Sequence, residues 1–548
     1  MFDPQRLGFA FFANPLESAT LRLRLTRVAG VWTCVRLVLG LVRRFMGPPQ
    51  WRAEEVGSRV YLMNGRGPRT HIRAVARLCL ASFRLASLGL GGIAAVGACT
   101  AAAADTLEWA LVQAYQNNPA LNAQRAALRA TDENVPQALS GYRPKLSVTS
   151  TDGFNYASTL SDTVNQSVSP NSVSYSNYAR DFGTRGVNAT ATQTLYNGFQ
   201  TANRTRQAES QVMGARETLR VTEQQVLLDA STSYMNLLRD QAILDLNRRN
   251  VEVLTEQLKQ TRDRFNVGEV TRTDVAQAES RLAAGRSALL GAQSNFVTSQ
   301  ANYRRVIGVD PGRLAPGTPV DRLSPAVLPV AIDQGQQQSP SVLAATYGVD
   351  IAELATKVSE GALYPNLALT ATAGKVYSPS YNVLKQTTAS VLGVLTVPIY
   401  QGGAEYSAIR QSKETLGQQR LNLDVTRDQA RATVVQSWGQ LDAAKAQIEA
   451  TTAQVNAAEI ALNGVREEAR VGQRTTLDVL NAQQELVNAR SALVTAQHDR
   501  VVASYTLLAA VGSLSMPRLG LDVLIYDPQV HYQQVRDAWV GVRTPDGR

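Results

Sequence analysis

The residues best suited to chemistry lie in two polar stretches, RFNVGEVTRTDV (264–275) and REEARVGQRTTLDV (466–479). Each contains V-G, five further residues and D-V. Glycine suits the left-handed end of a helix, and we expect Gly268 and Gly472 to end two incoming helices. Hydrogen bonding and ion pairing, rather than catalysis, are the chemistry that these stretches offer.

Threonine and aspartate complete each stretch. Thr273 and Thr476 are the expected caps of the returning helices, because a threonine hydroxyl accepts a bond from a free backbone N–H. Asp274 and Asp478 fall in or beside the first turns, where a negative charge complements the helix dipole. This structural role stays open beside any functional one.

Residues that would support metal binding or catalysis are scattered. The histidines His71, His498 and His531 stand apart from cysteines and from paired carboxylates at ligand spacing. The sequence has no G-x-S-x-G elbow and no phosphate-cradling glycine loop. We therefore expect a protein that is not an enzyme and that has no metal site and no cofactor.

Charge is divided unevenly along the chain. Of its 55 basic and 45 acidic residues, 14 arginines and 4 acids precede residue 105, which leaves 41 of each sign after it. The basic excess belongs to the leader and argues against a nucleic-acid partner for the rest. Cys34, Cys79 and Cys99 also precede residue 105, so neither disulfide nor thiol chemistry is available after it.

The leader is typical of an export signal. Arginines precede the apolar run LASLGLGGIAAVGACTAAAA, which ends in small residues suited to cleavage near Ala104. We interpret 63–104 as a signal peptide starting at Met63, and 1–62 as upstream sequence assigned in error or as an N-terminal extension. Lipidation at Cys99 is an alternative form of processing.

After the leader the chain contains an internal repeat. Pro144 recurs 221 residues later and Tyr196 recurs 204 residues later, so one 17-residue difference between them explains the whole register. We therefore predict a first repeat at 105–325, a second at 326–515 and a C-terminal tail at 516–548.

Each repeat is predicted to run helix, strand, loop, strand, very long helix, polar turn, helix. The expected strands of the first copy are PKLSVTST (144–151) and VNATATQTLY (187–196). Their counterparts are PNLALTATA (365–373) and SVLGVLTVPIY (390–400). A long polar loop is expected at 152–186.

The long helices carry a heptad seam. No proline occurs between Phe199 and Phe265, and at ~1.5 Å per residue such a helix spans on the order of 100 Å. The other faces are polar, so each helix is expected to have one packed and one solvated surface. The seam residues are Ala230, Leu237, Leu244, Val251, Leu258 and Phe265 in one copy, and Val434, Leu441, Ile448, Val455, Leu462 and Ala469 in the other.

The expected strands need partners. No run of about 18 apolar residues follows residue 105, so no membrane-spanning helix is predicted. An exported chain can still enter an outer membrane through a closed β-barrel, because closure satisfies every backbone hydrogen bond in lipid. Four strands are too few to close one. Copies of the chain must therefore pool their strands.

An ordered set of motifs suggests a family. Asn118-Pro119 and Ser339-Pro340 open the repeats, L-Y-N-G and I-Y-Q-G-G stand at the strand-to-helix junctions, and the two V-G-x5-D-V turns follow. With these features, residues 105–512 resemble the TolC family of outer-membrane channel proteins. The tail from Tyr526 to Trp539 is similar to the C-terminus of the subfamily serving type I secretion.

The resemblance implies a mixed α and β, TolC-like fold, in which a long α-helical coiled-coil barrel continues an outer-membrane β-barrel shared between subunits. It also implies a homotrimer in outer-membrane lipid, with a tunnel in the periplasm. This homotrimer would dock onto an inner-membrane transporter, expected to be of the ABC type, through a periplasmic adaptor. The implied function is the passive exit duct of a type I secretion or efflux system, with a periplasmic gate.

Family analogy assigns gate roles to residues of the two turns. Arg474 matches an arginine that holds the closed turn through polar links to a Thr-Asp pair, here Thr273 and Asp274. Asp478 matches an acidic ring at the constriction. The second acidic position of that ring is Asn481 in this chain, which implies a less acidic gate.

A second departure is Ala469, which stands where the family has a tyrosine that joins the closed turn. The gate is therefore expected to be looser. The implied contacts of the adaptor are the turn residues Val267, Gly268, Val471 and Gly472.

Three functional classes remain as alternatives. The duct could serve multidrug efflux rather than protein secretion. A periplasmic coiled-coil adaptor would have the long hairpin but no duplicated strand pairs, and the repeats at Pro144 and Pro365 count against it. A periplasmic enzyme lacks a convergent catalytic set.

Overall fold

The computed structural model describes residues 105–164, 173–380, 382–545 and 547. The expected signal peptide, the segment before it and Cys99 lie outside the described residues. Within these ranges, none of the helices combines the length and the apolar character that a membrane crossing needs.

The first copy begins with three helices that lead into a strand pair. Asn118 caps the second helix, since its side-chain oxygen accepts from the backbone N–H of Ala120 at 2.9 Å. Pro119 takes the first helical position, where a missing N–H has no cost. The elements are α2 (Leu107–Asn117), α3 (Pro119–Asp132), α4 (Asn134–Leu139), η1 (Ser140–Tyr142), β1 (Lys145–Val164), β2 (Val173–Asn197), α5 (Gln200–Asn266) and α6 (Arg272–Ile307).

The second copy repeats this order. Its elements are α7 (Leu328–Gln338), α8 (Pro340–Glu360), η3 (Gly361–Leu363), β3 (Asn366–Ser380), β4 (Val383–Thr396), α9 (Ala404–Arg470) and α10 (Thr476–Ala510). The short η2 (Asp321–Leu323) ends the first copy, and α11 (Pro528–Val535) lies in the tail. Helix α8 starts 221 residues after α3, and α9 starts 204 residues after α5. The element order therefore agrees with the repeat predicted from the sequence.

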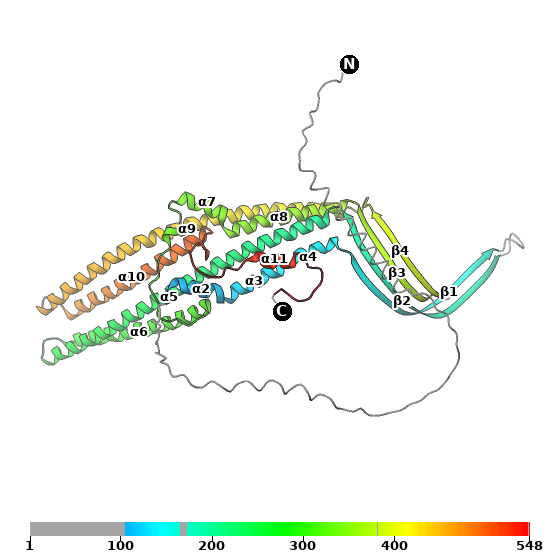
Figure 1. The fold of residues 1–548 in the computed structure, drawn as a ribbon. Helices are drawn as coiled ribbons and strands as arrows, with labels where there is room; N and C mark the ends of the chain where they lie inside the picture. Colours follow the sequence, from blue (N-terminus) through cyan, green and yellow to red (C-terminus); the bar gives the residue numbers. More distant parts are fainter. Residues whose placement is uncertain (1–104, 165–172, 381, 546, 548) are drawn as a thin grey trace, which may run out of the picture. The chain divides into compact units, whose positions relative to one another are not determined.

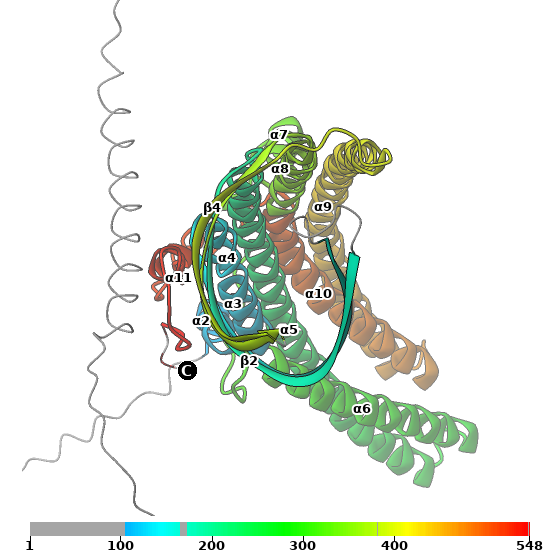
Figure 2. The same ribbon diagram turned by 90° about the vertical axis from the view of Figure 1, so that its right-hand side faces the viewer.

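The four strands form one antiparallel sheet in the order β1-β2-β3-β4. The sheet curves strongly and continues from one end of the long helices (Figures 1 and 2). Pairing of β2 with β3 joins the two copies, for example Thr190 beside Thr372. Strands β1 and β4 are the edges of the described sheet.

The predicted polar loop at 152–186 is wrong. Most of it is strand, because β1 has 20 residues and β2 has 25, against 15 and 14 for β3 and β4. Phe154, Tyr156 and Leu160 lie on the same face of β1 and are all exposed. Their polar neighbours resembled a loop in composition, although every second residue still fits a strand. The extra residues of the first copy therefore lengthen its strands.

The last predicted strand also ends early. Strand β4 stops at Thr396, so 397–400 are not part of it. Pro398 follows two residues later and has no N–H for the ladder.

The long helices pair into two antiparallel hairpins, α5 with α6 and α9 with α10, which run beside each other in Figure 1. Both α5 and α9 have 67 residues, as the heptad pattern predicts. Seam residues such as Ala230, Leu237 and Val434 are buried, whereas Phe265 at the tip is 43% exposed and leaves the seam. The helices thus pack along one stripe and keep polar residues outside.

The largest apolar cluster lies where the short helices meet the long ones. It joins α2 and α3 to α5, to the end of α6 and to the end of α10. Tyr234 is fully buried in it, and its hydroxyl donates to the carbonyl oxygens of Asp105 (2.7 Å) and Ala315 (2.6 Å). This body fixes the hairpins at one end and leaves the turns at the other.

Candidate functional site

Each hairpin turn begins with a helix that ends at a left-handed glycine. Gly268 has φ of 85° and Gly472 has φ of 81°. The N–H of Gly268 donates to the carbonyl of Phe265 at 3.0 Å, and that of Glu269 donates to the carbonyl of Arg264 at 2.9 Å. These bonds occupy carbonyls that a helix end would otherwise leave unpaired. The prediction that Gly268 and Gly472 end the incoming helices is confirmed.

A capping box starts each returning helix. Thr271 precedes α6, its hydroxyl accepts from the N–H of Asp274 at 3.3 Å, and its own N–H donates to the Asp274 carboxylate at 2.9 Å. Thr475 and Asp478 repeat the arrangement before α10, with distances of 3.3 Å and 3.0 Å. The two turns therefore share one local structure.

The predicted caps Thr273 and Thr476 are wrong. Thr273 lies at the second position of α6 and Thr476 at the first position of α10, inside the helices. The capping box needs a threonine three residues before the acid, and this spacing selects Thr271 and Thr475. The T-x-x-D signal was present in the sequence at both turns.

Asp478 is held in its ionised form. The backbone N–H of Thr475 and then its hydroxyl, at 3.0 Å and 2.9 Å, lower the pKa of the carboxyl below its ordinary value of 3.8. Arg474 also contributes by its charge. The site thus keeps a fixed negative charge at neutral pH beside a fixed positive one.

Arg474 has a partner within its own turn. Its Nε donates to Glu468 at 2.8 Å, and this carboxylate raises the pKa of the guanidinium. Asp274 is occupied by its own capping threonine. Within the single described chain, the contacts of Arg474 and of Asp274 therefore stay in separate hairpins, and the implied link between them stays a prediction.

The turn residues implied to contact an adaptor are accessible. Val267 is 72% exposed and Val471 is 71% exposed. A substituent on Gly268 or Gly472 would meet no atom within 4 Å. The tips therefore present two apolar side chains on open backbone.

Asn481 makes a contact between the hairpins that the sequence did not predict. The Nη2 of Arg281 on α6 donates to Asn481 Oδ1 on α10 at 2.6 Å. Leu480, beside it, is 3% exposed and packs among apolar residues of the first hairpin. No periodicity or motif marks Arg281, because the bond depends on how two hairpins lie against each other.

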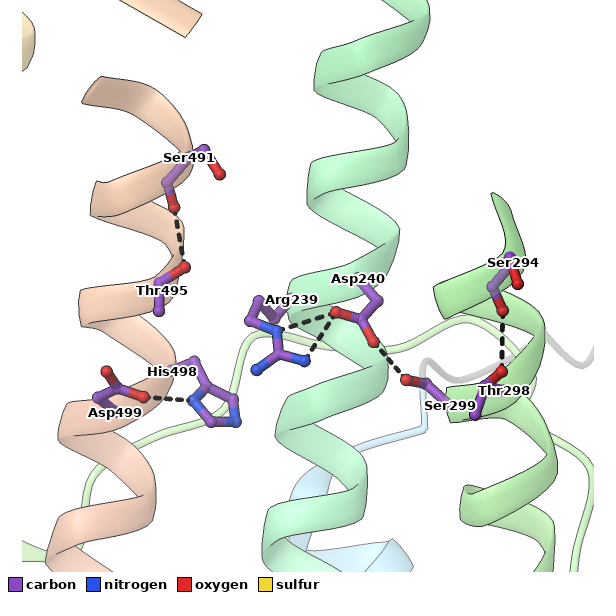
Figure 3. A network of polar contacts seen from close by, with 9 residues as sticks. All are labelled: Arg239, Asp240, Ser294, Thr298, Ser299, Ser491, Thr495, His498 and Asp499. Carbon is purple, nitrogen blue, oxygen red and sulfur yellow. Dashed lines mark hydrogen bonds and ion pairs between the residues drawn. The ribbon is translucent and has the colours of Figure 1, made fainter. Parts of the chain in front are cut away.

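A second polar cluster lies inside the helical bundle, where α5, α6 and α10 face one another (Figure 3). Asp240, which is buried, accepts from Arg239 at 2.9 Å and from the hydroxyl of Ser299. His498 instead bonds Asp499 on its own helix at 2.8 Å. The serine and the imidazole belong to separate pairs, so the cluster fixes helix packing and does not form a catalytic triad.

Known proteins similar in sequence to this chain fit the architecture described above. A family model described as outer membrane efflux protein matches residues 110–309 and 331–513. The outer membrane efflux protein BepC of Brucella suis is 41% identical over 450 residues, which cover 82% of this chain and 94% of that protein. The outer membrane protein TolC of Escherichia coli is 25% identical over 446 residues, 77% of this chain and 85% of that one.

A solved structure supports the fold. The CmeC outer membrane channel of Campylobacter jejuni superimposes with a TM-score of 0.63 at 16% identity, covering 79% of this chain and 89% of that one. The likeness at this identity concerns the arrangement of helices and strands.

The fold and the paired turns define a TolC-like outer-membrane channel protein. The chain belongs to the outer membrane efflux protein family, which consists of channel proteins rather than enzymes. It is an outer-membrane protein with a periplasmic tunnel, and it provides an exit duct for efflux or secretion. Channels of this kind act as trimers with periplasmic adaptors and inner-membrane transporters.

Proposed function

We propose that three copies of this chain form the passive duct of a tripartite export system, and that the two hairpin turns of each copy close its periplasmic end. The observation that carries the proposal is the pair of identical capped turns at the helix ends remote from the sheet. A ring of such turns narrows the tunnel at one level without contributing any chemistry.

The open edges of the sheet support pooling of strands between copies. Strands β1 and β4 each pair with one strand of the described sheet, so their outer backbone groups need partners in lipid. Val391 and Leu395, which lie on one face of β4, are exposed, as lipid-facing residues of a shared β-barrel would be.

The gate is proposed to depend on competition for Arg474. In the described chain this guanidinium bonds Glu468, and in the closed ring it would also reach Thr273 and Asp274 of a neighbouring hairpin. Asp478, ionised and at the same level, would contribute the acidic ring. Both arginine contacts are solvated, so few and weak bonds would need to break for opening.

An adaptor is proposed to bind at the tips. Val267 and Val471 project beside the ion pairs Arg264–Glu269 (2.9 Å) and Arg474–Glu468 (2.8 Å). Apolar centres with charged neighbours suit a contact with another protein. The transporter behind the adaptor is proposed to be of the ABC type. The four-stranded sheet and the match to the outer membrane efflux protein family count against the alternative that this chain is itself the adaptor.

Two cargo classes compete. Likeness of the tail to the type I secretion subfamily favours protein export, whereas the 41% identity to the outer membrane efflux protein BepC favours efflux. A strain lacking the gene would separate them: loss of a secreted protein from the medium supports the first, and increased sensitivity to several unrelated drugs supports the second.

The duct and its gate are tested in planar bilayers. The parent protein should form channels of low conductance, and Arg474→Ser should raise the single-channel conductance because the closed turn loses its charged donor. Arg470→Ser is the matched control, since Arg470 pairs with Glu467 on its own helix at 3.3 Å. Absence of channels would contradict the duct, and equal effects of the two variants would contradict the gate assigned to Arg474.

A further inference from the structure

The start of α10 divides its side chains between the two hairpins. Val479 is buried with Val455, Leu462 and Leu486, which belong to the hairpin of α10 itself. Leu480, the next residue, is buried in the other hairpin. Its cluster there consists of Leu254, Leu258, Ala278 and Leu282.

A hydrogen bond crosses between the hairpins at the same level. Asn481 accepts from the Arg281 guanidinium at 2.6 Å. Neighbouring bonds stay within one hairpin, as Arg262 to Glu279 (2.6 Å) does in the first hairpin and Arg466 to Gln483 (3.0 Å) does in the second. The Arg281 bond thus joins the two hairpins, whereas these neighbouring polar bonds are internal to one hairpin.

The contact between the hairpins is not symmetric, because the first copy of the repeat has no equivalent of it. A shift of 204 residues takes Leu480 to Ala276, which is exposed, and Asn481 to Gln277. The second hairpin inserts Leu480 into the first hairpin, whereas the first hairpin has only Ala276 at the equivalent position. Within one chain, the second hairpin is anchored on the first, and the reverse contact is not built.

We propose that Arg281, Asn481 and Leu480 form an intrachain latch that limits how far the second hairpin can move from the first, and so sets how easily the periplasmic end opens. This inference rests on the proposed gate. Leu480 is buried and fixes where the hairpins touch. The Arg281–Asn481 bond adds a directional contact between a half-buried arginine and an exposed asparagine.

The neutral acceptor makes the latch adjustable. A hydrogen bond from a guanidinium to an amide oxygen is weaker than one to a carboxylate. Arg281→Gln should therefore raise the ratio of open to closed channels by roughly tenfold per latch, and Asn481→Asp should lower it by a similar factor. Single-channel recordings of the purified oligomer measure both ratios.

Arg262→Gln is the matched control. It removes an arginine from an ion pair of equal length, at 2.6 Å, that remains within one hairpin. Its open-to-closed ratio should equal that of the parent. If Arg281→Gln and Arg262→Gln behave alike, or if Asn481→Asp opens the channel, the latch is overturned.

A crosslink tests the same idea without removing an interaction. Residues 105–548 contain no cysteine, so Arg281→Cys with Asn481→Cys allows a short cleavable crosslinker to join the hairpins. Crosslinked channels should stay closed and reopen on cleavage, whereas a crosslink between Arg262→Cys and Glu279→Cys should have no effect. Crosslinked channels that open like the parent would overturn the latch.

The two proposals fail in different ways. If Arg474→Ser raises the conductance but the latch variants and crosslinks change nothing, the gate stands and the latch is wrong. If neither Arg474→Ser nor the latch variants respond, the gate itself is wrong and the latch falls with it. Oligomer yield is monitored throughout, and Asn481→Asp keeps the test decisive if Arg281→Gln assembles poorly.

Discussion

At the scale of residues, the two turns show how a short polar pattern sets a local structure. Thr475 and Asp478 satisfy each other's backbone N–H groups, and Thr271 and Asp274 do the same at the other turn. Because these bonds are local, they form in any chain that places threonine three residues before aspartate at a helix start. Gate function needs contacts beyond the turn, so it must be tested separately from capping.

Replacing Thr475 with Ala should reduce the stability of the first turn of α10 by about 0.5–2 kcal/mol, because the N–H of Asp478 loses its acceptor. Thr476→Ala is the control, since this threonine lies inside the helix and is not the cap. Hydrogen exchange of the amides from Asp478 to Leu480 measures the difference. Equal protection in the two variants would contradict the cap assignment.

The capping box should also give a pH dependence. Asp478 has a lowered pKa in the folded protein, so its contribution to stability is present above the ordinary value of 3.8 and is lost as the pH falls through the lower folded value. Cation selectivity in bilayers should therefore persist at pH 4, and Asp478→Asn should be less selective at every pH. A parent channel that loses selectivity well above pH 4 would show that another group is responsible.

At the scale of elements, the C-terminal tail is held along the first copy. Helix α11 contacts α3, where the ring Nδ1 of His531 lies 2.9 Å from the buried carboxylate of Asp132. Burial raises the pKa of Asp132, while the bond to His531 opposes the rise. Arg143 donates to the carbonyl of Ala538 at 2.6 Å and stacks over Trp539. The tail therefore connects the short helices to the start of β1.

His531→Ala should loosen this tail, because Asp132 loses its buried partner at a cost of about 1–3 kcal/mol. Trypsin should then cut faster after Arg536 and Arg543. Val530→Ala, which truncates a side chain that is 52% exposed on the same helix, is the control. Unchanged cleavage in His531→Ala would show that the aromatic and arginine contacts hold the tail without the histidine.

At the scale of the whole molecule, the sheet of the described chain has two edge strands that each pair on one side only. Its edge strands β1 and β4 are long, and β4 is exposed along its entire length. Such edges are unstable in lipid unless they pair. The helical hairpins bury only a stripe each, which leaves their other faces for neighbours and water.

The detergent-extracted protein should therefore be an oligomer, with three chains as in its family. Mass photometry measures the mass directly, and a stable monomer would contradict the shared barrel. Deleting 365–400, which contains all of β3 and β4, should abolish membrane insertion. Insertion of that variant would show that the second strand pair is dispensable.

Patterns that act within a few residues could be read from the sequence. The heptad seam gave both 67-residue helices, the duplicated glycines gave the turns, and the proline pair gave the starts of α3 and α8. Composition led to the wrong prediction of a loop at 152–186. A strand that alternates exposed apolar residues with polar ones has the same overall composition as a loop. The caps Thr271 and Thr475 also follow a sequence signal, T-x-x-D, which the predicted caps Thr273 and Thr476 do not fit.

Contacts between hairpins were decided only by the tertiary structure. Helical periodicity shows that Leu480 and Arg281 face inward or sideways, but it does not set the rotation and offset of one hairpin against another. Those depend on the packing of four long helices fixed at their far end by the short ones. The sequence thus determined the elements, the repeat and the turns. The bond from Arg281 to Asn481 and the burial of Leu480 among residues of the other hairpin exist only because the folded helices bring distant partners into contact.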